Sequence, residues 1–527
     1  MAVAAGYRIR ENQLGHELRF CRSHFAFDAS LMEKMRWGTL PGPERVLLEL
    51  LFPGSDLSRT IDLALLPEHS GAMNHDRGPF LDSAKASSRV NPGNLLCLLA
   101  LVLLILVGPA ARADWPEFRG SWGDGHVSAP GDLKPIGLPL HWSETNNIKW
   151  KTEIPYRGWS TPVVTGGQVW LTTATDDGHD FYAIGVDEET GQIRFNERVF
   201  HSDHPEPLGN GASMNCYATP SPVIEQGRVY IHFGSFGTAC LDTSTGKVLW
   251  KREDLRCRHY RGPSSSLVSF ENLLILTMDG VDVQYHVALD KQTGKTVWKT
   301  DRSVAWNDEN VPGPMARDGD LRKAHSTPLI VMDATKPEML SAGAKAVYGY
   351  DPRTGRELWR VQYDDWSVAP RPLFEHGVAF IVTGLSKKEL WAVKTDGQGD
   401  VTDTHVNWKL GTHVGIYASP ILVDGLIYTA AEQNNVTCVE AATGQVVWTG
   451  RIGGKYAASP IYGDGRLYFC SQQGTTSVLK PGRTFEVLAS NTLASGFMAS
   501  PAVDGKALFL RTKTHLYCIE SSGAETN

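Results

Sequence analysis

The sequence predicts an all-β protein, an eight-bladed β-propeller made of four-stranded antiparallel blades. Three patterns lead to this prediction, and they return in the same order along the chain. They are a Ser-Pro or Thr-Pro pair followed by apolar residues, short segments of alternating apolar and polar residues, and an Asp-x-x-Thr-Gly sequence before an aromatic residue. Repeats of this kind at intervals of roughly 40 to 60 residues are typical of propeller blades.

The Ser/Thr-Pro pair is predicted to open the innermost strand of each blade. Proline cannot donate a backbone hydrogen bond, and it is therefore tolerated at the first residue of an edge strand. Complete copies contain Pro162, Pro222, Pro328, Pro420, Pro460 and Pro501, and two degenerate copies follow Arg261 and surround Pro370. These eight copies predict eight blades.

The second and third strands of each blade follow as alternating segments. Residues 227–233 read GRVYIHF, and residues 425–431 read GLIYTAA. A period of two indicates a strand, because successive side chains of a strand point to opposite faces. The third strands end in sequences such as TACLD at residues 238–242.

The Asp-x-x-Thr-Gly sequence is predicted to turn the chain from the third strand to the fourth. Its glycine can adopt a positive φ, and its Asp and Thr side chains can bond nearby backbone N–H groups. The aromatic residue of the fourth strand would bury about 150–250 Å² against the next blade. We therefore interpret the repeated residues as structural, and they are Asp187, Gly191, Asp242, Gly246, Trp250, Asp290, Gly294, Trp298, Asp351, Gly355, Trp359, Trp408, Gly444 and Trp448.

Residues 146–154 are predicted to close the ring. They form an amphipathic segment around Trp150 that no other blade uses, and the last blade has no aromatic fourth strand of its own. Adding this segment to the last blade would supply the missing strand and remove two open sheet edges.

Residues 89–113 are predicted to be a signal peptide. An apolar run from Leu95 to Val107 follows Arg89 and ends in small residues, with Ala113 just before the expected cleavage point. The run is shorter than the ~20 residues of a membrane-spanning helix, and an uncleaved anchor is the alternative. We expect a periplasmic or secreted protein without a membrane span in the mature chain.

The other boundaries follow from these assignments. Residues 1–88 are expected to be poorly ordered or to come from an over-called start codon, because residues 1–72 show no clear strand or helix period and a start at Met73 would place the signal peptide near the N-terminus. Residues 114–140 would form the N-terminal leader of the mature chain, and residues 141–520 the propeller.

The charge pattern excludes two classes of partner. The 527 residues carry a formal net charge of -7, with both signs scattered along the chain. Nucleic acids and anionic membranes attract basic patches, and the sequence contains none. We expect a monomer whose partner is a protein or a small molecule.

The repeat also resembles a known family. Residues 288–298, ALDKQTGKTVW, and their variants resemble the repeats of the pyrroloquinoline quinone (PQQ)-like β-propellers, which include the quinoprotein alcohol dehydrogenases and the BamB-type outer-membrane assembly lipoproteins. Residues 114–127, DWPEFRGSWGDGHV, resemble the leader of exported PQQ-like repeat proteins of planctomycetes. The resemblance covers roughly residues 114 to 520 and implies the quinoprotein alcohol dehydrogenase-like propeller fold.

The resemblance implies a cofactor that this sequence does not support. Quinoprotein dehydrogenases stack the quinone on a disulfide between adjacent cysteines and hold Ca²⁺ with Glu, Asn and Asp. No two cysteines are adjacent here, and those after the predicted signal peptide are Cys216, Cys240, Cys257, Cys438, Cys470 and Cys518. We therefore expect no PQQ, no calcium or other metal, and no catalytic residue.

The cysteines also offer few disulfides. Cys240, Cys438 and Cys518 occupy the same third-strand position in different blades, which is too far apart for a bridge. A disulfide between Cys216 and either Cys240 or Cys257 is an alternative that the sequence allows. Asp396, Asp400 and Asp403 lack the spacing of a calcium loop and are interpreted as a solvated hairpin insertion in blade five.

The loops that lead into the first strands carry the candidate binding residues. In a propeller these loops surround one mouth of the central channel, and here they are rich in aromatic and cationic residues. Such residues either pack the inner wall or converge as anchors for a ligand. The candidates are Arg157, Trp159, Tyr217, His259, Tyr260, Arg261, His325, Trp366, Tyr417, Lys455 and Tyr456.

Three function classes are compatible with these observations. The first is an exported, non-catalytic binding or scaffold module that resembles the BamB-type proteins. The second is a PQQ-dependent oxidoreductase. The third is a carbohydrate-active propeller, for which Asp364 and Asp365 are the only acidic pair in the mouth loops.

Overall fold

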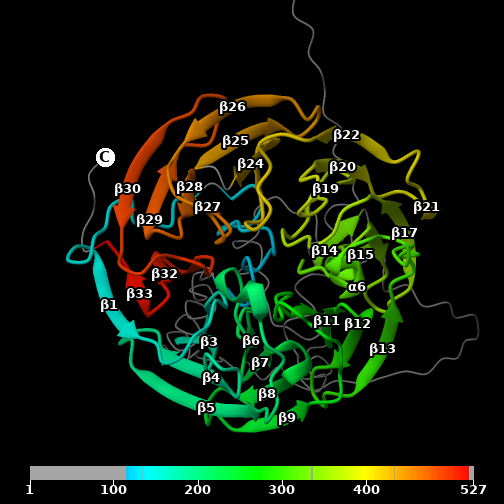
Figure 1. Ribbon diagram of the computed structural model, residues 1–527. Coiled ribbons are helices and arrows are strands. Elements are labelled where there is room, and N and C mark those ends of the chain that lie inside the picture. The colour runs from blue at the N-terminus through cyan, green and yellow to red at the C-terminus, as the bar shows by residue number, and fades with distance from the viewer. Residues whose placement is uncertain (1–113, 133, 334–335, 432–433, 522–527) are drawn as a thin grey trace, which may run out of the picture. The chain divides into compact units, whose positions relative to one another are not determined.

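The computed structural model describes residues 114–132, 134–333, 336–431 and 434–521. Within these ranges the strands form eight sheets, each with at least four antiparallel strands. Figure 1 shows the sheets arranged around a central axis, one after another in chain order. The predicted signal peptide and residues 1–88 lie outside the described residues. The prediction of an eight-bladed propeller is confirmed.

The first four blades follow the chain from the innermost strand outward. Blade one has β2 (Val163–Thr165), β3 (Gln168–Ala174), β4 (Asp180–Asp187) and β5 (Ile193–His201). Blade two has β6 (Val223–Glu225), β7 (Arg228–His232), β8 (Thr238–Asp242) and β9 (Val248–Arg252). Blade three has β10 (Val268–Phe270), β11 (Leu273–Asp279), β12 (Gln284–Asp290) and β13 (Thr296–Asp301). Blade four has β14 (Leu329–Asp333), β15 (Lys336–Ala342), β16 (Ala346–Tyr350), β17 (Glu357–Gln362) and a short fifth strand, β21 (Gly399–Asp400).

The other blades repeat this order. Blade five has β18 (Leu373–Glu375), β19 (Val378–Val382), β20 (Leu390–Lys394) and β22 (Val406–Leu410). Blade six has β23 (Ile421–Val423), β24 (Leu426–Ala431), β25 (Asn435–Glu440) and β26 (Val446–Arg451). Blade seven has β27 (Ile461–Gly463), β28 (Arg466–Cys470), β29 (Thr475–Leu479) and β30 (Val487–Thr492). Blade eight has β31 (Ala502–Asp504), β32 (Ala507–Arg511), β33 (His515–Ile519) and β1 (Ile148–Glu153).

The helices of the described residues are single turns in loops. They are η3 (Gly209–Ser213), η4 (Gly234–Phe236), α6 (Pro314–Arg317) and η5 (Asp320–Arg322). None of them is long and apolar enough to span a membrane.

The ring is closed by a strand from the start of the described chain. β1 pairs antiparallel with β33, and Trp150 lies opposite Cys518. Figure 1 shows β1, in cyan, beside β33, in red. The predicted closure by residues 146–154 is thereby confirmed, and blade eight has four strands like its neighbours.

Burial follows the position of a strand within its blade. The second strands are almost fully buried, as in β3, because the neighbouring blades cover both faces. The fourth strands lie at the rim, and in β13 only Trp298 is buried. Apolar clusters therefore fill the spaces between successive blades.

The repeated Trp residues join each blade to the next. Trp250 of blade two lies against Gly294 in the Thr-Gly turn of blade three, and its Nε1 donates to the carbonyl oxygen of Lys291 at 2.9 Å. Trp150 makes the same contact with Gly191 and donates to Glu188 at 2.8 Å. The predicted wedge is confirmed, and the turn glycine is also the surface on which it packs.

Trp359 departs from this pattern, because blade five has no Thr-Gly turn. Its Nε1 donates to Glu338 of its own blade at 2.5 Å. The Asp-rich segment predicted as a solvated hairpin instead contributes β21, which pairs in parallel with β17. Asp400 accepts a hydrogen bond from Gln362 and lies 3.5 Å from Arg360, so this loop extends blade four.

The hydroxyl of the Ser/Thr-Pro pair has a role that the sequence did not suggest. The backbone N–H of Thr161 in blade one donates to the Ser221 hydroxyl of blade two at 2.9 Å. Ser221 donates likewise to Ser266, and Ser266 to Thr327. The same bonds link blades five to eight through Ser419, Ser459 and Ser500. We call this set of blade-to-blade bonds the hydroxyl belt.

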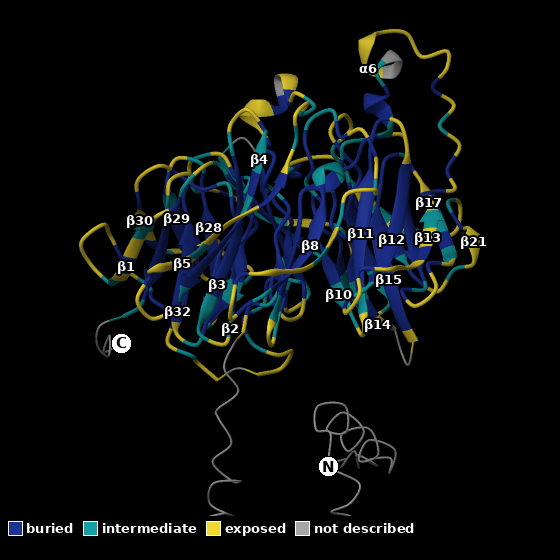
Figure 2. Cartoon of the chain, turned by 90° about the horizontal axis from the view of Figure 1, so that it is seen from below, coloured by how far each residue is buried: buried dark blue, intermediate teal, exposed yellow. Residues whose placement is uncertain are grey.

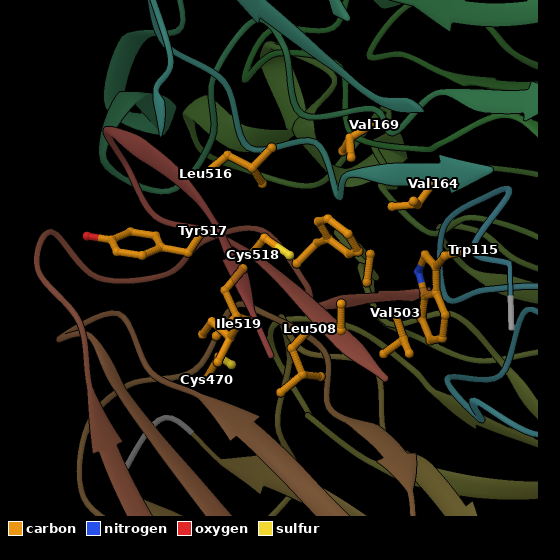
Figure 3. Packing of buried hydrophobic residues seen from close by; sticks show 14 of the residues in the cluster. Trp115, Val164, Val169, Cys470, Val503, Leu508, Leu516, Tyr517, Cys518 and Ile519 are labelled. Atoms are coloured by element: carbon orange, nitrogen blue, oxygen red, sulfur yellow. The ribbon is translucent and has the colours of Figure 1, made fainter. Parts of the chain in front are cut away.

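The leader crosses the channel at the end of the ring where the inner strands finish. Residue Trp115 forms a two-hydrogen-bond bridge with Val164 of blade one. Figure 3 shows its indole packed between Val164 and Val503 of blade eight. Further along, Gly125 and Val127 bond the backbone of Tyr462 in blade seven.

Two buried arginines fix the leader in place. Arg119 donates to the carbonyl oxygens of Pro420 and Pro460 in blades six and seven. Arg371 stands where the other blades of the belt carry Ser or Thr, and its guanidinium donates to Phe118 at 2.7 Å. Because one short segment reaches inner strands on opposite sides of the ring, it lies across the channel axis.

The six cysteines of the described residues are free and buried. The disulfide that the sequence left open, Cys216 with Cys240 or Cys257, is not formed. Burial raises the pKa of Cys470 to about 12, which keeps its thiol protonated.

Candidate functional site

The loops that lead into the first strands gather at one end of the channel, opposite to the leader. Because the strands of a blade are antiparallel, the loops between second and third strands emerge at this same end. In Figure 2 the loop that carries α6 projects beyond the strand ends on this side, and much of it is exposed. We call this end the mouth.

A cavity of about 470 Å³ lies at the mouth above blades seven, eight and one. Arg157 and Trp159 line it, as the sequence predicted for the mouth. The other lining residues are Tyr156, Asp176, Ser213, Gln472, Met498 and Lys513. We call this cavity the mouth pocket.

Arg157 and Trp159 form one wall of the mouth pocket. The Arg157 guanidinium lies over the Trp159 ring at 4.9 Å, a cation–π contact. Its Nη2 donates to the carbonyl oxygen of Ala212 at 2.6 Å, and its Nη1 lies 3.9 Å from Asp176. Next to it, Tyr156 has a φ of 63° and stacks on Tyr182. A tyrosine seldom adopts this left-handed conformation. Residues that do adopt it are often found at binding sites.

Residues 202–218 form a long loop over the mouth, here called the cap loop. It carries η3, and Tyr217 anchors it by donating to the carbonyl oxygen of Glu206 at 3.0 Å. The hydroxyl of Tyr417, from the loop before blade six, donates to the sulfur of Met214 at 2.9 Å. Two predicted ligand-binding residues therefore hold this loop across the mouth.

A buried cluster of two histidines and a lysine lies beneath the mouth on the side of blades three and four. His259 accepts a hydrogen bond from the Ser235 N–H at its Nε2, and its Nδ1 lies 3.3 Å from the Lys323 ammonium. Burial, and secondly Lys323, holds the pKa of His259 well below its usual range. The same two causes, in the same order, lower the pKa of His325, whose Nδ1 lies 2.9 Å from the Ser264 hydroxyl.

The acidic pair near the mouth, Asp364 and Asp365, already has partners. Asp365 is buried and accepts hydrogen bonds from the backbone N–H groups of Trp366, Ser386 and Lys387 at 2.8–2.9 Å. These bonds fix the loop between the second and third strands of blade five. Asp364 lies 2.9 Å from Lys345, and that lysine is the main cause that lowers its pKa.

The other predicted residues take separate places. Arg261 pairs with the buried Asp320 at 2.7 Å and lies over the ring of Tyr260. Tyr456 is buried and donates to the carbonyl oxygen of Gly453. Lys455, its neighbour in the same loop, is exposed. The eleven residues are thus spread over the whole mouth.

Sequence analysis missed most of the residues that line the mouth pocket. Asp176, Gln472 and Lys513 lie in loops between second and third strands, whereas the prediction rested on the loops that lead into the first strands. Their proximity to Arg157 depends on which loops share one end of the ring, and the antiparallel strand order alone would have indicated it.

Within the described residues, no three or more His, Cys, Asp and Glu side chains gather as metal ligands. Asp320, Asp364 and Asp365 bond arginine, lysine or backbone groups, and the exposed Asp176 is the only carboxylate among the described residues that line the mouth pocket. The donor groups of the mouth therefore do not fit a calcium–quinone centre of the kind that the resemblance implied.

Comparison with known proteins gave one matching family. The family described as "Outer membrane protein assembly factor BamB" matches residues 140–258 and 283–526. The tetrathionate hydrolase of Acidithiobacillus ferrooxidans is 25% identical over 281 residues, which cover 49% of this chain and 51% of that protein. The chain thus spans about half the length of this curated relative.

Two solved structures share the architecture. The quinohemoprotein alcohol dehydrogenase from Comamonas testosteroni superposes with a TM-score of 0.53 at 12% identity, covering 79% of this chain and 82% of that chain. The quinohemoprotein alcohol dehydrogenase ADHIIG from Pseudomonas putida HK5 gives 0.51 at 13% identity, with 79% and 81% covered. At such identities the likeness shows the fold alone.

Proposed function

Because the chain belongs to the family described as outer membrane protein assembly factor BamB, we propose that it is an exported, non-catalytic propeller that binds a protein or a small ligand at its mouth. The family match concerns the repeats that build the blades, and the signal-like segment at residues 89–113 supports export. The mouth pocket is the place where this binding would occur.

The state of the mouth's titratable groups carries the proposal. General acid–base catalysis needs a group that can gain and lose a proton near the working pH. The Asp365 carboxylate is instead bonded by backbone N–H groups, and Asp320 by Arg261. His259 is held neutral by burial, since its pKa lies well below the usual range. These groups support binding rather than chemistry, and they leave the carbohydrate-active alternative without a free acidic pair at residues 364–365.

The donor set also supports a function without quinone. The sequence lacks adjacent cysteines, and its free thiols are buried in separate blades. Of the mouth carboxylates that could serve as hard ligands for Ca²⁺, Asp320, Asp364 and Asp365 are already paired, and Asp176 is the only carboxylate among the described residues that line the mouth pocket. The proposed function therefore includes no reaction step that involves PQQ.

Reconstitution with the quinone tests this proposal. The purified full-length chain is incubated with PQQ and Ca²⁺, and dye reduction is followed with simple alcohols and sugars. We expect a rate equal to that of a protein-free blank, while a quinoprotein alcohol dehydrogenase assayed in parallel reduces the dye. Saturable micromolar PQQ binding accompanied by turnover would overturn the non-catalytic assignment in favour of an oxidoreductase.

A further inference from the structure

The mouth pocket has an excess of positive charge. Arg157 and Lys513 line it, and Asp176 is its only carboxylate among the described residues. The 3.9 Å separation of Asp176 from Arg157 and the 83% exposed side chain of Asp176 make this a weak ion pair. Lys513 has no side-chain partner in the described chain, so its ammonium is free to meet a ligand.

A third cation lies directly behind the pocket wall. Arg511 is 3% exposed, and its Nη1 donates to the carbonyl and hydroxyl oxygens of Ser160 at 3.1 and 2.7 Å. No carboxylate of the described residues pairs with it. Its guanidinium packs against Gly158, between the two residues that form the wall, at a point where any Cβ would overlap it. Burial lowers the pKa of Arg511 to about 10, so it stays charged at neutral pH.

The rest of the lining is uncharged. Tyr156 is 44% exposed, and the Trp159 ring and the Met498 thioether also face the pocket. Ser213 and Gln472 add neutral hydrogen-bonding groups. A ligand that fills this space would place a negative charge by the cations and an apolar group against the rings.

We propose that the mouth pocket binds a carboxylate that is attached to an apolar or aromatic group, with Arg157 and Lys513 as the charged contacts. The planar guanidinium of Arg157 matches the geometry of a carboxylate, and the uncompensated Arg511 behind it strengthens the local positive potential. The pocket lining carries two cations and one carboxylate, which leaves one positive charge for a single anionic group. This inference rests on the proposed function and names the ligand class of the same site.

The carboxylate could come from a free small molecule or from the C-terminus of a polypeptide. The purified full-length chain is titrated by calorimetry at low ionic strength with 3-phenylpropionate and with its neutral amide. The peptide Ala-Ala-Ala-Phe, as free acid and as C-terminal amide, forms the second arm. We expect each acid to bind at least tenfold tighter than its amide and to weaken as salt is raised. The arm with the tighter acid identifies the source.

Three variants test the residues. Lys513→Gln should weaken binding of the acids about tenfold and leave the amides unchanged. Asp176→Asn should tighten binding of the acids several-fold, because it removes the competing negative charge. Lys506→Gln serves as the matched control, since Lys506 pairs with Glu520 in a different part of the propeller, and it should change neither. Equal thermal midpoints for all three would show that the fold is intact.

Several outcomes would overturn the carboxylate assignment. They are equal affinities for acid and amide, an affinity for inorganic phosphate above that for the acids, and an affinity of Asp176→Asn for the acids below that of the wild type. The absence of binding by either acid at millimolar concentration would do so too. Each of these outcomes is independent of quinone-dependent dye reduction, which alone bears on the non-catalytic character of the protein.

Discussion

The glycine of the Thr-Gly turn meets two separate requirements. Gly294 has a φ of +69°, which L-residues adopt at a cost of roughly 1–2 kcal/mol. A Cβ at this position would also lie 2.6 Å from the Trp250 ring of the preceding blade. The same residue therefore shapes the turn and accepts the neighbouring wedge.

A pair of alanine substitutions separates the two requirements. Gly425 also has a positive φ, +72°, but no atom lies within 4 Å of its added Cβ. We expect Gly425→Ala to lower the free energy of unfolding by about 1–2 kcal/mol, the conformational cost alone. Gly294→Ala should add about 1–3 kcal/mol, because the indole must shift in a packed interface. Denaturant midpoints measure both, and equal losses would contradict the second role.

Arg371 occupies the position of a belt Ser or Thr, but its side chain has a different partner. Its backbone N–H still donates to the belt hydroxyl of Ser419, but its side chain binds the leader instead of accepting from the preceding blade. It also lies 3.4 Å from the Glu117 carboxylate, whose pKa burial raises despite this arginine. The guanidinium thus compensates a buried acid that would otherwise be unpaired.

At the scale of elements, the leader is held by hydrogen bonds to the inner strands of several blades. Arg371→Ser would restore the belt hydroxyl of blade five but remove the contacts to Phe118 and Glu117. We expect hydrogen exchange at the Trp115 and Val127 amides to speed up at least tenfold, since these amides are bonded to inner strands only while the leader is seated.

A second variant controls for damage to the belt. Ser500→Ala removes the hydroxyl that accepts from Ser459 and touches no leader residue through its side chain. Leader amides should exchange at the wild-type rate in this variant. Unchanged exchange in Arg371→Ser would mean that Arg119 and Trp115 hold the leader without help from Arg371.

The blades could be predicted because each repeats a local pattern. The position of the leader in the channel could not be predicted in this way. The Ser/Thr-Pro pairs, the alternating strands and the Thr-Gly turns each report on a few neighbouring residues. The seat of the leader depends instead on Arg119 meeting Pro420 and Pro460, which are some three hundred residues away. The one local sign was Arg371, an arginine in a hydroxyl position.

The candidate site was predicted in part for a similar reason. Arg157 and Trp159 lie in a loop of the repeated kind, and the structure places both at the mouth pocket. The cap loop belongs to no repeated pattern, so nothing in its sequence showed that Tyr217 and Tyr417 would serve as its anchors. Buried Arg511 belongs to a strand, and only the fold reveals that its charge lies behind the pocket.

At the scale of the whole molecule, closure by β1 couples the two ends of the described chain. Trp150 and Trp298 are equally buried, each 9% exposed, and each donates its indole N–H to the next blade. One wedge joins blade eight to blade one across the closure, and the other joins consecutive blades in mid-chain. In a closed ring the two positions are equivalent.

Equal losses of stability are therefore expected at these two positions. Trp150→Ala and Trp298→Ala should each lower the free energy of unfolding by about 3–5 kcal/mol, the range for a large buried aromatic residue. Guanidinium unfolding followed by circular dichroism measures both. If the closure were loose in solution, Trp150→Ala would leave the midpoint almost unchanged while Trp298→Ala still lowered it. Because β1 also leads directly into Tyr156 and Arg157, such a result would mean that the wall of the mouth pocket already moves in the wild type, and Trp150→Ala would then leave ligand affinity unchanged as well.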